Sequence, residues 1–399
     1  MKIYNNEKVG NKRIVKILNI PIYVVNWDNN FREQHILGNF IYTSKFDDYI
    51  CNTEKNTKIC GLNVFKRTED GSLKKDYIFN FLYKTTDMKK EFYNKYKKFF
   101  DQDCDDIYIL NSNSGETYLF LAFLASNFIK KNGSKKPLLV ATKKYHIELI
   151  KMLHPDAKFV YVNKMQLFVS GDVFSVYKKR VFLLFPGEHF INVENSINNG
   201  EINSVHYFEM MLDRLHLTRE DIEPKQIHLD NSVKHALMEK TKQMGLNTDK
   251  FVLLAPEALS CDDIRPEFWT KLCLEFQKCG YDVFMNITNE DTVIPNCTYK
   301  SCFLTFSEIC ELAQMAKFIV SLRSGLTEIL LQSKTPLVSL YTKFKNRHRY
   351  KEMPVERVLS GFSLEKLPRI SDNFYEYNMS DIAQDDLIKE IKDLALRVN

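Results

Sequence analysis

From residue 105 onward, short apolar runs alternate with segments of helical period. The apolar runs cover residues 105–110, 137–141, 158–162, 181–185, 251–255, 281–287, 318–321 and 337–340. Helical patterns lie between them at residues 116–130, 144–152, 266–279, 305–315 and 326–333. Strands that alternate with helices build parallel sheets covered by helices on both faces. The sequence therefore predicts an α/β protein with two successive doubly wound blocks.

The alternation pauses between residues 203 and 249, where the pattern is helical without intervening strands. We therefore predict two Rossmann-like domains, 105–240 and 241–375, facing across a cleft. Residues 376–399 form a C-terminal helix that can return to the first domain. Such a cleft suits two substrates, since ligands bind beyond the carboxyl ends of the strands in open α/β sheets.

Residues 1–104 read as an N-terminal extension packed on the first domain. Residues 22–25 favour a short strand, whereas residues 76–82 and 88–100 favour helices, and we find no internal repeat of short period. The segment 88–100 interleaves Lys with aromatic residues. This pattern fits contact with an anionic membrane surface, and it fits better an ordinary amphipathic helix with a solvated basic face.

Composition restricts the compartment and the partners. With 399 residues, of which 44% are apolar, the chain can bury sizeable cores, and its net charge of +5 is too weak to indicate nucleic acid. The nine Cys residues show no zinc-ligand spacing, and no signal peptide or membrane-spanning run is present. We expect a soluble cytoplasmic protein, with peripheral contact at the inner face of the cytoplasmic membrane as an option.

The stretch SNSGET, residues 112–117, stands where a strand turns into a helix. Ser114 and Gly115 leave room for an acceptor at this helix start. Glu116 has two readings: a first-turn acid placed for the helix dipole, or a general base that projects into the cleft.

Two further strand-end loops, in the second block, are suited to phosphate. In residues 255–265, Glu257, Ser260 and Arg265 form a polar loop before Pro266, where Asp262 or Asp263 serves as the helix cap in the alternative reading. Residues 321–328 place Arg323 for a diphosphate and Glu328 for ribose hydroxyls, in a loop whose small or polar members are Ser324, Gly325 and Thr327. The alternative reading makes Thr327 the N-cap and Glu328 a first-turn acid.

Two other segments carry polar or cationic residues after apolar runs. The last strand is followed by the basic residues Lys343, Lys345, Arg347, Arg349 and Lys351, which would attract an anionic donor or form a solvated charge run. Glu188 and His189 follow the run 181–185 and are candidates for contact with an acceptor.

Taken in order, these motifs resemble glycosyltransferase family 9, which includes the ADP-heptose:lipopolysaccharide heptosyltransferases. The resemblance rests on APEALS (255–260), RPEFW (265–269), GYDV (280–283) and TFSEICELAQMAKFIVSLRSGLTEILLQSKTPLVSLY (305–341). SNSGET matches the family's S-x-G-D helix start, and residues 206–217 resemble its inter-domain stretch. The match covers roughly residues 105–345.

This resemblance implies a GT-B fold and an inverting glycosyltransferase that needs no metal and no other cofactor. A nucleotide-sugar would bind residues 241–375, and a glycan or lipid-linked acceptor would lie against residues 105–240, with Glu116 as the base. The implied product is a cell-surface glycan, such as lipopolysaccharide, lipooligosaccharide or capsule.

The sequence departs from the family at three site positions. Glu116 replaces Asp, Arg323 stands in the place of an Asp, and Glu328 stands in the place of a His. The last two lie in the donor site and argue against ADP-heptose as the donor. Two alternatives stay open: a nucleotide-sugar epimerase of the same fold, and a non-catalytic subunit that binds a nucleotide-sugar or glycan.

Overall fold

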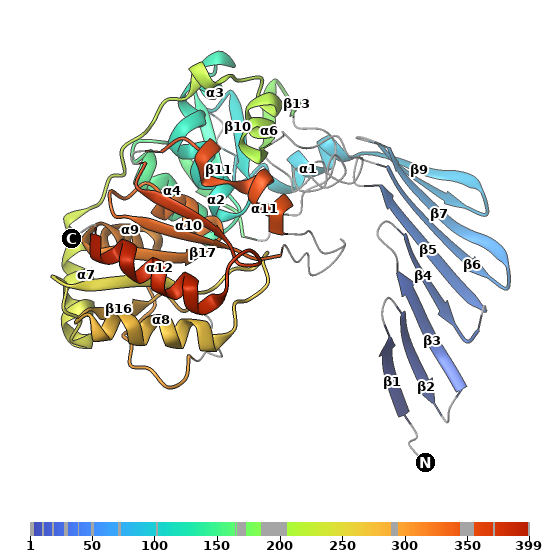
Figure 1. Ribbon diagram of the computed structural model, residues 1–399. Helices are drawn as coiled ribbons and strands as arrows, with labels where there is room; N and C mark the ends of the chain where they lie inside the picture. Colours follow the sequence, from blue (N-terminus) through green and yellow to red (C-terminus); the bar gives the residue numbers. More distant parts are fainter. Residues whose placement is uncertain are drawn as a thin grey trace. The chain divides into compact units, whose positions relative to one another are not determined.

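The computed structural model contains a single chain with three β-sheets and helices distributed along the sequence (Figure 1). It describes residues 4–9, 12–17, 20–27, 31–38, 40–48, 52–70, 73–100, 103–163, 165, 173–184, 206–288, 294–343, 355–369 and 372–397. The chain divides into two compact units. Unit 1 comprises Met1–Ile109, Lys135–Val140 and Lys164–Pro186, and unit 2 comprises Leu110–Ser134, Ala141–Asn163 and Gly187–Asn399.

The first sheet, in unit 1, is an antiparallel meander of nine strands whose spatial order follows the chain. Its strands are β1 (Tyr4–Val9), β2 (Lys12–Ile17), β3 (Ile20–Trp27), β4 (Phe31–Ile36), β5 (Ile41–Asp48), β6 (Asn52–Ile59), β7 (Leu62–Asp70), β8 (Leu73–Ile78) and β9 (Phe81–Asp87). Among the residues of these strands whose burial is described, Val25 and Asp76 are the buried ones. The sheet is therefore stabilised mainly by its backbone ladder and by cross-strand pairs such as Arg67–Asp76, 2.6 Å apart.

The prediction of a helix over residues 76–82 is wrong. This segment contains the end of β8, the tight turn at Phe79 and Asn80, and the start of β9. Both turn residues have positive φ angles, 48° and 66°, which a helix excludes. The predicted strand over residues 22–25 is confirmed within β3.

The sheet repeats one structural unit, the β-hairpin, although the sequence analysis found no internal repeat of short period. Four hairpins close with an apolar pair across the strands: Ile17–Ile20, Ile36–Ile41, Ile59–Leu62 and Ile78–Phe81. The spacing of these hairpins along the chain is uneven and their turn residues differ. The structural repeat is therefore visible in the strand register and does not appear as a fixed period in the sequence.

Helix α1 (Met88–Tyr96) follows the meander and confirms the first part of the predicted helix 88–100. Its Asp87 cap accepts hydrogen bonds from the N–H groups of Lys89 and Lys90. The aromatic side chains of Phe92, Tyr93 and Tyr96 are buried. Their burial favours the ordinary amphipathic reading of this helix.

The second sheet has five strands in the order β12-β11-β10-β14-β13. They are β10 (Asp106–Leu110), β11 (Pro137–Ala141), β12 (Phe159–Tyr161), β13 (Val173–Val176) and β14 (Lys179–Leu184). Strands β13 and β14 form an antiparallel hairpin. The run of helical residues after β10 consists of α2 (Ser114–Leu119), a π-helical segment (Phe120–Leu124) and α3 (Ala125–Lys131), so the predicted helix 116–130 is confirmed.

The third sheet, in unit 2, is parallel throughout and has the order β16-β15-β17-β18-β19. Its strands are β15 (Phe251–Ala255), β16 (Asp282–Met285), β17 (Phe318–Leu322), β18 (Leu337–Tyr341) and β19 (Phe374–Asn378). The first four were predicted from their apolar runs. These strands are easily recognised in the sequence, because strands buried on both faces are almost continuously hydrophobic.

The other helices are α4 (Lys144–Leu153), α6 (Tyr207–Arg214), α7 (Asn231–Met244), α8 (Pro266–Lys278), α9 (Phe306–Met315), α10 (Gly325–Leu330), α11 (Val355–Phe362) and α12 (Gln384–Arg397), with short 3₁₀ turns at Arg219–Asp221 and Leu364–Lys366. Figure 1 shows α8 and α12 side by side, and Lys392 of α12 contacts Glu275 of α8 at 3.1 Å. The C-terminal helix α12 thus packs against α8, which follows strand β15 of the third sheet. The sequence had also allowed this helix to return to residues 105–240. No helix in the described part of the chain is long and apolar enough to cross a bilayer.

The domain boundaries predicted from the sequence, after residues 104, 240 and 375, stay predictions.

Candidate functional site

Two helices of unit 2 begin with the similar local pattern Ser-Gly-x-Thr. Ser-Gly-Glu-Thr at 114–117 opens α2, and Ser-Gly-Leu-Thr at 324–327 contains the cap and first residues of α10. In each case the final Thr hydroxyl bonds to a Ser near the end of the preceding strand. Ser112 Oγ lies 2.8 Å from Thr117 Oγ1, and Ser321 Oγ lies 3.0 Å from Thr327 Oγ1. These side-chain bonds tie each helix start to the end of the strand before it.

The two helix starts touch each other at glycine. A Cβ atom added to Gly115 would lie 1.8 Å from Glu328 Oε2 and 2.7 Å from the Cα of Gly325. A Cβ atom added to Gly325 would lie 2.8 Å from the backbone N of Gly115. Because these neighbours include backbone atoms, only glycine fits at either position without a main-chain shift.

We expect Gly115→Ala to lower the free energy of unfolding by about 3 kcal/mol, since the added methyl overpacks a backbone contact. Denaturant unfolding measures this change. Gly133→Ala is the matched control, because its added Cβ meets nothing within 4 Å although φ is +66°; its expected loss is about 1 kcal/mol. Equal losses in the two variants would show that α2 and α10 do not touch in the folded protein in solution.

Glu116 is buried beside this contact. Its side chain is 6% exposed, and its Oε2 accepts a hydrogen bond from the N–H of Asn113 at 3.0 Å. Burial raises the pKa of Glu116 to about 7, the Asn113 N–H opposes this rise, and the neighbouring Glu328 adds to it. The residue is therefore a first-turn acid, as one reading of the sequence had it, and its pKa also suits a general base near neutral pH.

Three side chains just after β11 converge on one carbonyl oxygen in this turn. Lys143 Nζ, Tyr145 Oη and His146 Nε2 lie 3.0, 3.1 and 3.1 Å from the oxygen of Ser112. The Nδ1 of His146 accepts from the N–H of Thr142, so Nε2 carries the proton and the imidazole is neutral. Burial lowers the pKa of His146 to about 4, in agreement with this tautomer.

Of these three side chains, Lys143 places a positive charge near the carboxylate of Glu116. Burial lowers the pKa of Lys143, whereas the charge of Glu116 raises it. The sequence analysis missed Lys143, Tyr145 and His146. A signal was present, since the segment KKYH follows the apolar run 137–141 directly, at a strand end.

Arg323 and Glu328 form a buried ion pair. The Nη2 of Arg323 lies 2.8 Å from Oε1 of Glu328, and both side chains are about 5% exposed. Arg323 also donates to the carbonyl oxygens of Phe362 and Ser324, at 3.0 and 2.7 Å. Tyr207 donates its hydroxyl to the same Oε1 of Glu328 at 2.5 Å. The two residues predicted for diphosphate and ribose therefore bind each other in this structure.

The second carboxylate oxygen of Glu328, Oε2, is buried and makes no hydrogen bond. A buried carboxylate oxygen without a partner is costly, and this one packs against Gly115, where an added Cβ atom would lie 1.8 Å from it. Tyr207, which orients the carboxylate, was missed as a site residue, although its stretch 206–217 figured in the family resemblance.

The loop after β15 lies against the ends of the neighbouring strands. The N–H of Asp262 donates to the carbonyl oxygen of Lys343 at 2.8 Å, and the Cys261 thiol lies 3.5 Å from the carbonyl oxygen of Arg323. Glu257 is held at the other end of the loop by the backbone N–H and hydroxyl of Thr288, at 2.8 and 2.6 Å. Within unit 2, the structure therefore brings together the predicted strand-end loops at 255–265 and 321–328.

The other predicted residues of these loops are more exposed or take part in helix capping. Ser260 is half-buried and Arg265 is exposed. Arg265 is itself the N-cap of α8, so the expectation of Asp262 or Asp263 as the cap is wrong. The N-cap of α10 is Ser324 rather than Thr327, because the helix begins one turn earlier at Gly325. Glu328 remains in the first turn, as predicted.

Some predicted residues lie outside the described part of the chain. These are the acceptor candidates Glu188 and His189 and the basic residues Lys345, Arg347, Arg349 and Lys351. No cluster of three or more His, Cys, Asp or Glu residues able to hold a metal ion occurs among the described residues. The expected independence from metal stays a prediction.

No family model matches the chain, and no curated protein matches it. Among solved structures, a glycosyl transferase of family 9 from Veillonella parvula DSM 2008 is 12% identical, with 73% of this chain and 97% of that chain covered and a TM-score of 0.49. The E. coli ADP-heptose lps heptosyltransferase II is 12% identical over 73% of this chain and 99% of that chain, with a TM-score of 0.44. The E. coli heptosyltransferase WaaC with ADP is 9% identical over 72% and 99%, with a TM-score of 0.34. These structures come from the group that the sequence motifs resemble.

Proposed function

We propose that the chain is a GT-B glycosyltransferase that moves a sugar from a nucleotide-sugar to a hydroxyl of a cell-surface glycan. The observation that carries the proposal is Glu116, a buried carboxyl at a strand-to-helix turn whose pKa is raised to about 7. A carboxylate with this pKa can take a proton from a hydroxyl near neutral pH. The ordered family motifs at residues 105–345 support the same reading.

In the proposed reaction, Glu116 removes the proton of the acceptor hydroxyl as its oxygen attacks the anomeric carbon. The bond from that carbon to the donor's diphosphate breaks, and the nucleoside diphosphate leaves with the bonding electrons. A base on the acceptor side and a leaving group on the opposite face imply inversion at the anomeric carbon. Ser114, half-buried at the start of α2, would border the acceptor, whereas Gly115 packs against Gly325 and Glu328.

The donor is proposed to bind at the strand-end loops of the third sheet. Its diphosphate would meet the loop 257–260 and Arg265, and Ser324 would allow close approach to the backbone. The space beside Gly325 is filled by Gly115, and Thr327 is buried. Glu328 would accept from ribose hydroxyls through Oε2, which makes no hydrogen bond, and this requires α10 to move away from Gly115, against which Oε2 now packs. For Arg323 to reach a diphosphate, it would exchange the carboxylate of Glu328 for phosphate oxygens, which the guanidinium binds with the same planar geometry.

The family differences at Arg323 and Glu328 separate this donor from ADP-heptose. A cation in place of an Asp and a carboxylate in place of a His change both the charge and the hydrogen-bonding capacity beside the donor. We therefore propose another nucleotide-sugar, and an acceptor in lipopolysaccharide, lipooligosaccharide or capsule.

A ligand panel tests the proposal. We expect one class among ADP-, GDP-, UDP- and CMP-sugars to raise the melting temperature of the full chain, because a ligand at 100 times its Kd stabilises by about 2.7 kcal/mol. The free sugars without nucleotide are the control and should leave the temperature unchanged.

The outcomes separate the proposal from its alternatives. Donor consumption that requires a glycan acceptor supports the transferase. Conversion of the nucleotide-sugar without any acceptor would identify an epimerase, and binding without turnover in the presence of acceptors would indicate a non-catalytic subunit. No shift with any nucleotide-sugar would contradict the donor site at Arg323 and Glu328.

A further inference from the structure

The nine-stranded sheet carries a row of apolar hairpin ends. Because its strands are antiparallel and follow the chain order, the hairpins β2–β3, β4–β5, β6–β7 and β8–β9 all turn at the same end of the sheet (Figure 1). We call these four ends the apolar tips. Their described large apolar residues are Ile17, Ile20, Ile36, Leu37, Phe40, Ile41, Ile59, Leu62, Ile78, Phe79, Phe81 and Leu82.

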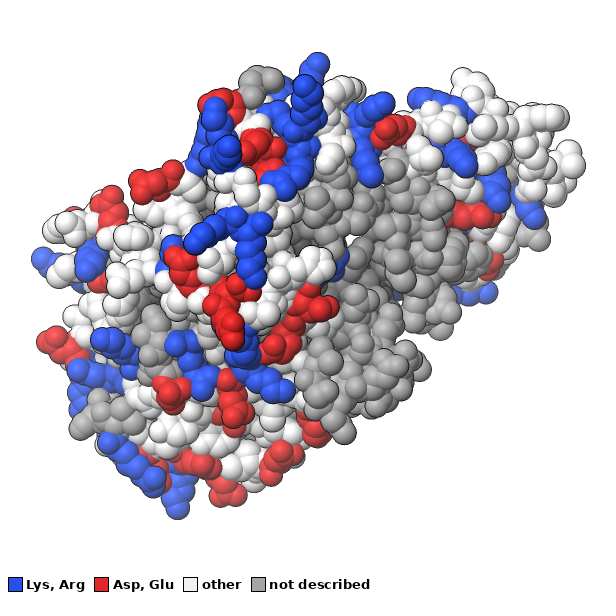
Figure 2. All heavy atoms as spheres, turned by 90° about the horizontal axis from the view of Figure 1, so that it is seen from above, with Lys and Arg blue, Asp and Glu red and all other residues white. Residues whose placement is uncertain are grey.

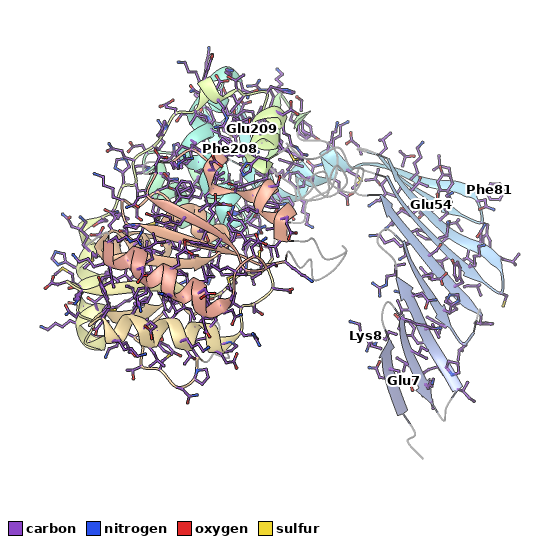
Figure 3. All side chains as sticks on the ribbon, in the orientation of Figure 1. Glu7, Lys8, Glu54, Phe81, Phe208 and Glu209 are labelled. Atoms are coloured by element: carbon purple, nitrogen blue, oxygen red, sulfur yellow. The ribbon has the colours of Figure 1, made fainter. Side chains whose placement is uncertain are left out.

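The apolar tips are exposed. Phe81 is 79% exposed, Leu62 68%, Ile20 64% and Leu37 62%. Figure 3 shows Phe81 at the outer end of its hairpin, with Glu54 farther back on β6. Most of the exposed large apolar side chains in the described part of the chain belong to this sheet. A contiguous row of such side chains marks an interaction surface.

The turn residues are unusual for hairpins. Leu37, Cys60 and Phe79 have φ angles of 49°, 47° and 48°. Turns with positive φ favour Asn, Asp or Gly, and a bulky side chain there is strained. The stability of the hairpins does not explain large apolar residues at these positions, whereas contact with an apolar environment does.

The charged residues among the described residues of the apolar tips are basic. Among the described residues of the tips, 16–17, 20–21, 35–38, 40–41, 58–64 and 77–84, there are three Lys and no Asp or Glu. In Figure 2, which looks down on the molecule, the outer end of this sheet is largely white, and both blue and red side chains lie behind it.

We propose that the apolar tips dock the protein on an anionic lipid bilayer. Strands are about 4.8 Å apart, so the four hairpins form a line about 40 Å long that can lie in one plane. Apolar side chains that enter the headgroup boundary, with Lys side chains just behind them, match the chemistry of an anionic membrane surface. Helix α1 is less suited to this contact, since Phe92, Tyr93 and Tyr96 are buried.

A binding experiment on the full chain tests the proposal. We expect sedimentation with vesicles of phosphatidylcholine and phosphatidylglycerol, and much weaker sedimentation with phosphatidylcholine alone. The double variant Leu37→Asn/Phe79→Asn should lose at least about tenfold in vesicle affinity, because two apolar side chains leave the interface. Asn tolerates positive φ, so both hairpins should fold, which circular dichroism checks.

Tyr177→Asn is the matched control. Tyr177 is also exposed and has a φ angle of 50°, but it lies in the β13–β14 hairpin of the second sheet. Its vesicle affinity should equal that of the unchanged chain.

Three results would overturn the proposal: no binding of the unchanged chain to anionic vesicles, undiminished binding of the double variant, or equal losses in the double variant and the control. A change of oligomeric state in the double variant without vesicle binding would show that a second copy of the chain covers the tips. None of these results depends on whether the protein transfers sugar.

Discussion

Glu116→Gln is expected to lower the rate of sugar transfer by about two to four orders of magnitude, the usual contribution of a general base. Gln has nearly the same volume as Glu, and its amide oxygen can accept the N–H of Asn113 that now binds Oε2 at 3.0 Å. The change therefore removes the proton acceptor while it preserves the turn. The measurement is kcat/KM with the donor found in the ligand panel. Glu116→Asp, which restores the residue type of the resembled family, is the control and should retain part of the rate.

The pH dependence gives a second readout of the same residue. The pKa of Glu116 is raised from the ordinary 4.5 to about 7, mainly by burial. The rate of the unchanged protein should rise as pH increases through about 7, since only the carboxylate accepts a proton. Stability should change in the opposite direction. The folded state holds the proton more tightly, so the stabilisation is fully present below pH 4.5 and is lost as pH rises through about 7.

Glu116→Gln should abolish this loss of folding stability at rising pH, because the Gln side chain does not ionise. The unchanged protein should lose roughly 3 kcal/mol more than the variant between pH 5 and pH 8, at about 1.4 kcal/mol for each unit of pKa change. Denaturant titrations at the two pH values measure the difference. If the variant keeps full activity and the same pH dependence of stability, Glu116 is neither the base nor the buried titrating group.

Arg323→Met is expected to lower the free energy of unfolding by about 3–5 kcal/mol, since removal of one partner leaves a buried charge uncompensated. Glu328 is 5% exposed, and without Arg323 its Oε1 would retain only the hydroxyl of Tyr207. The carbonyl oxygens of Phe362 and Ser324 would also lose a donor. Urea unfolding followed by fluorescence measures the change.

Two controls separate the buried pair from a general loss of positive charge. Arg265→Met changes an exposed Arg in the loop after β15 and should alter stability by less than about 0.5 kcal/mol. The double variant Arg323→Met/Glu328→Met should recover part of the loss, because apolar residues of similar volume often replace buried ion pairs well. A loss in Arg323→Met no larger than in Arg265→Met would mean that the pair is open to solvent.

Local patterns predicted much of the α/β part of the chain. Strand β15, Phe251–Ala255, has the bounds predicted from its apolar run. The capping box of α9, in which Thr305 and Glu308 exchange hydrogen bonds, was also predicted. Both depend on residues at most a few positions apart, so the chain itself carries the information.

The N-terminal sheet was predicted poorly for a physical reason. Its strands are half-exposed on both faces, so they lack the clean alternation of a strand with one buried side. The segment 76–82 contains apolar residues at spacings that also fit a helix. The turn at Phe79 and Asn80, with no Gly or Pro, gave no sign of a break.

The sequence by itself determined which residues stand at the helix starts. Glu116, Arg323 and Glu328 follow apolar strands, and that placement needed only local pattern. The tertiary structure alone decided what these residues contact. It brought Gly115 against Gly325, closed the ion pair beside Tyr207, and buried Glu116 so that its pKa rises. Contacts between residues more than a hundred positions apart, and the loss of water around a charge, depend on packing that no local pattern encodes.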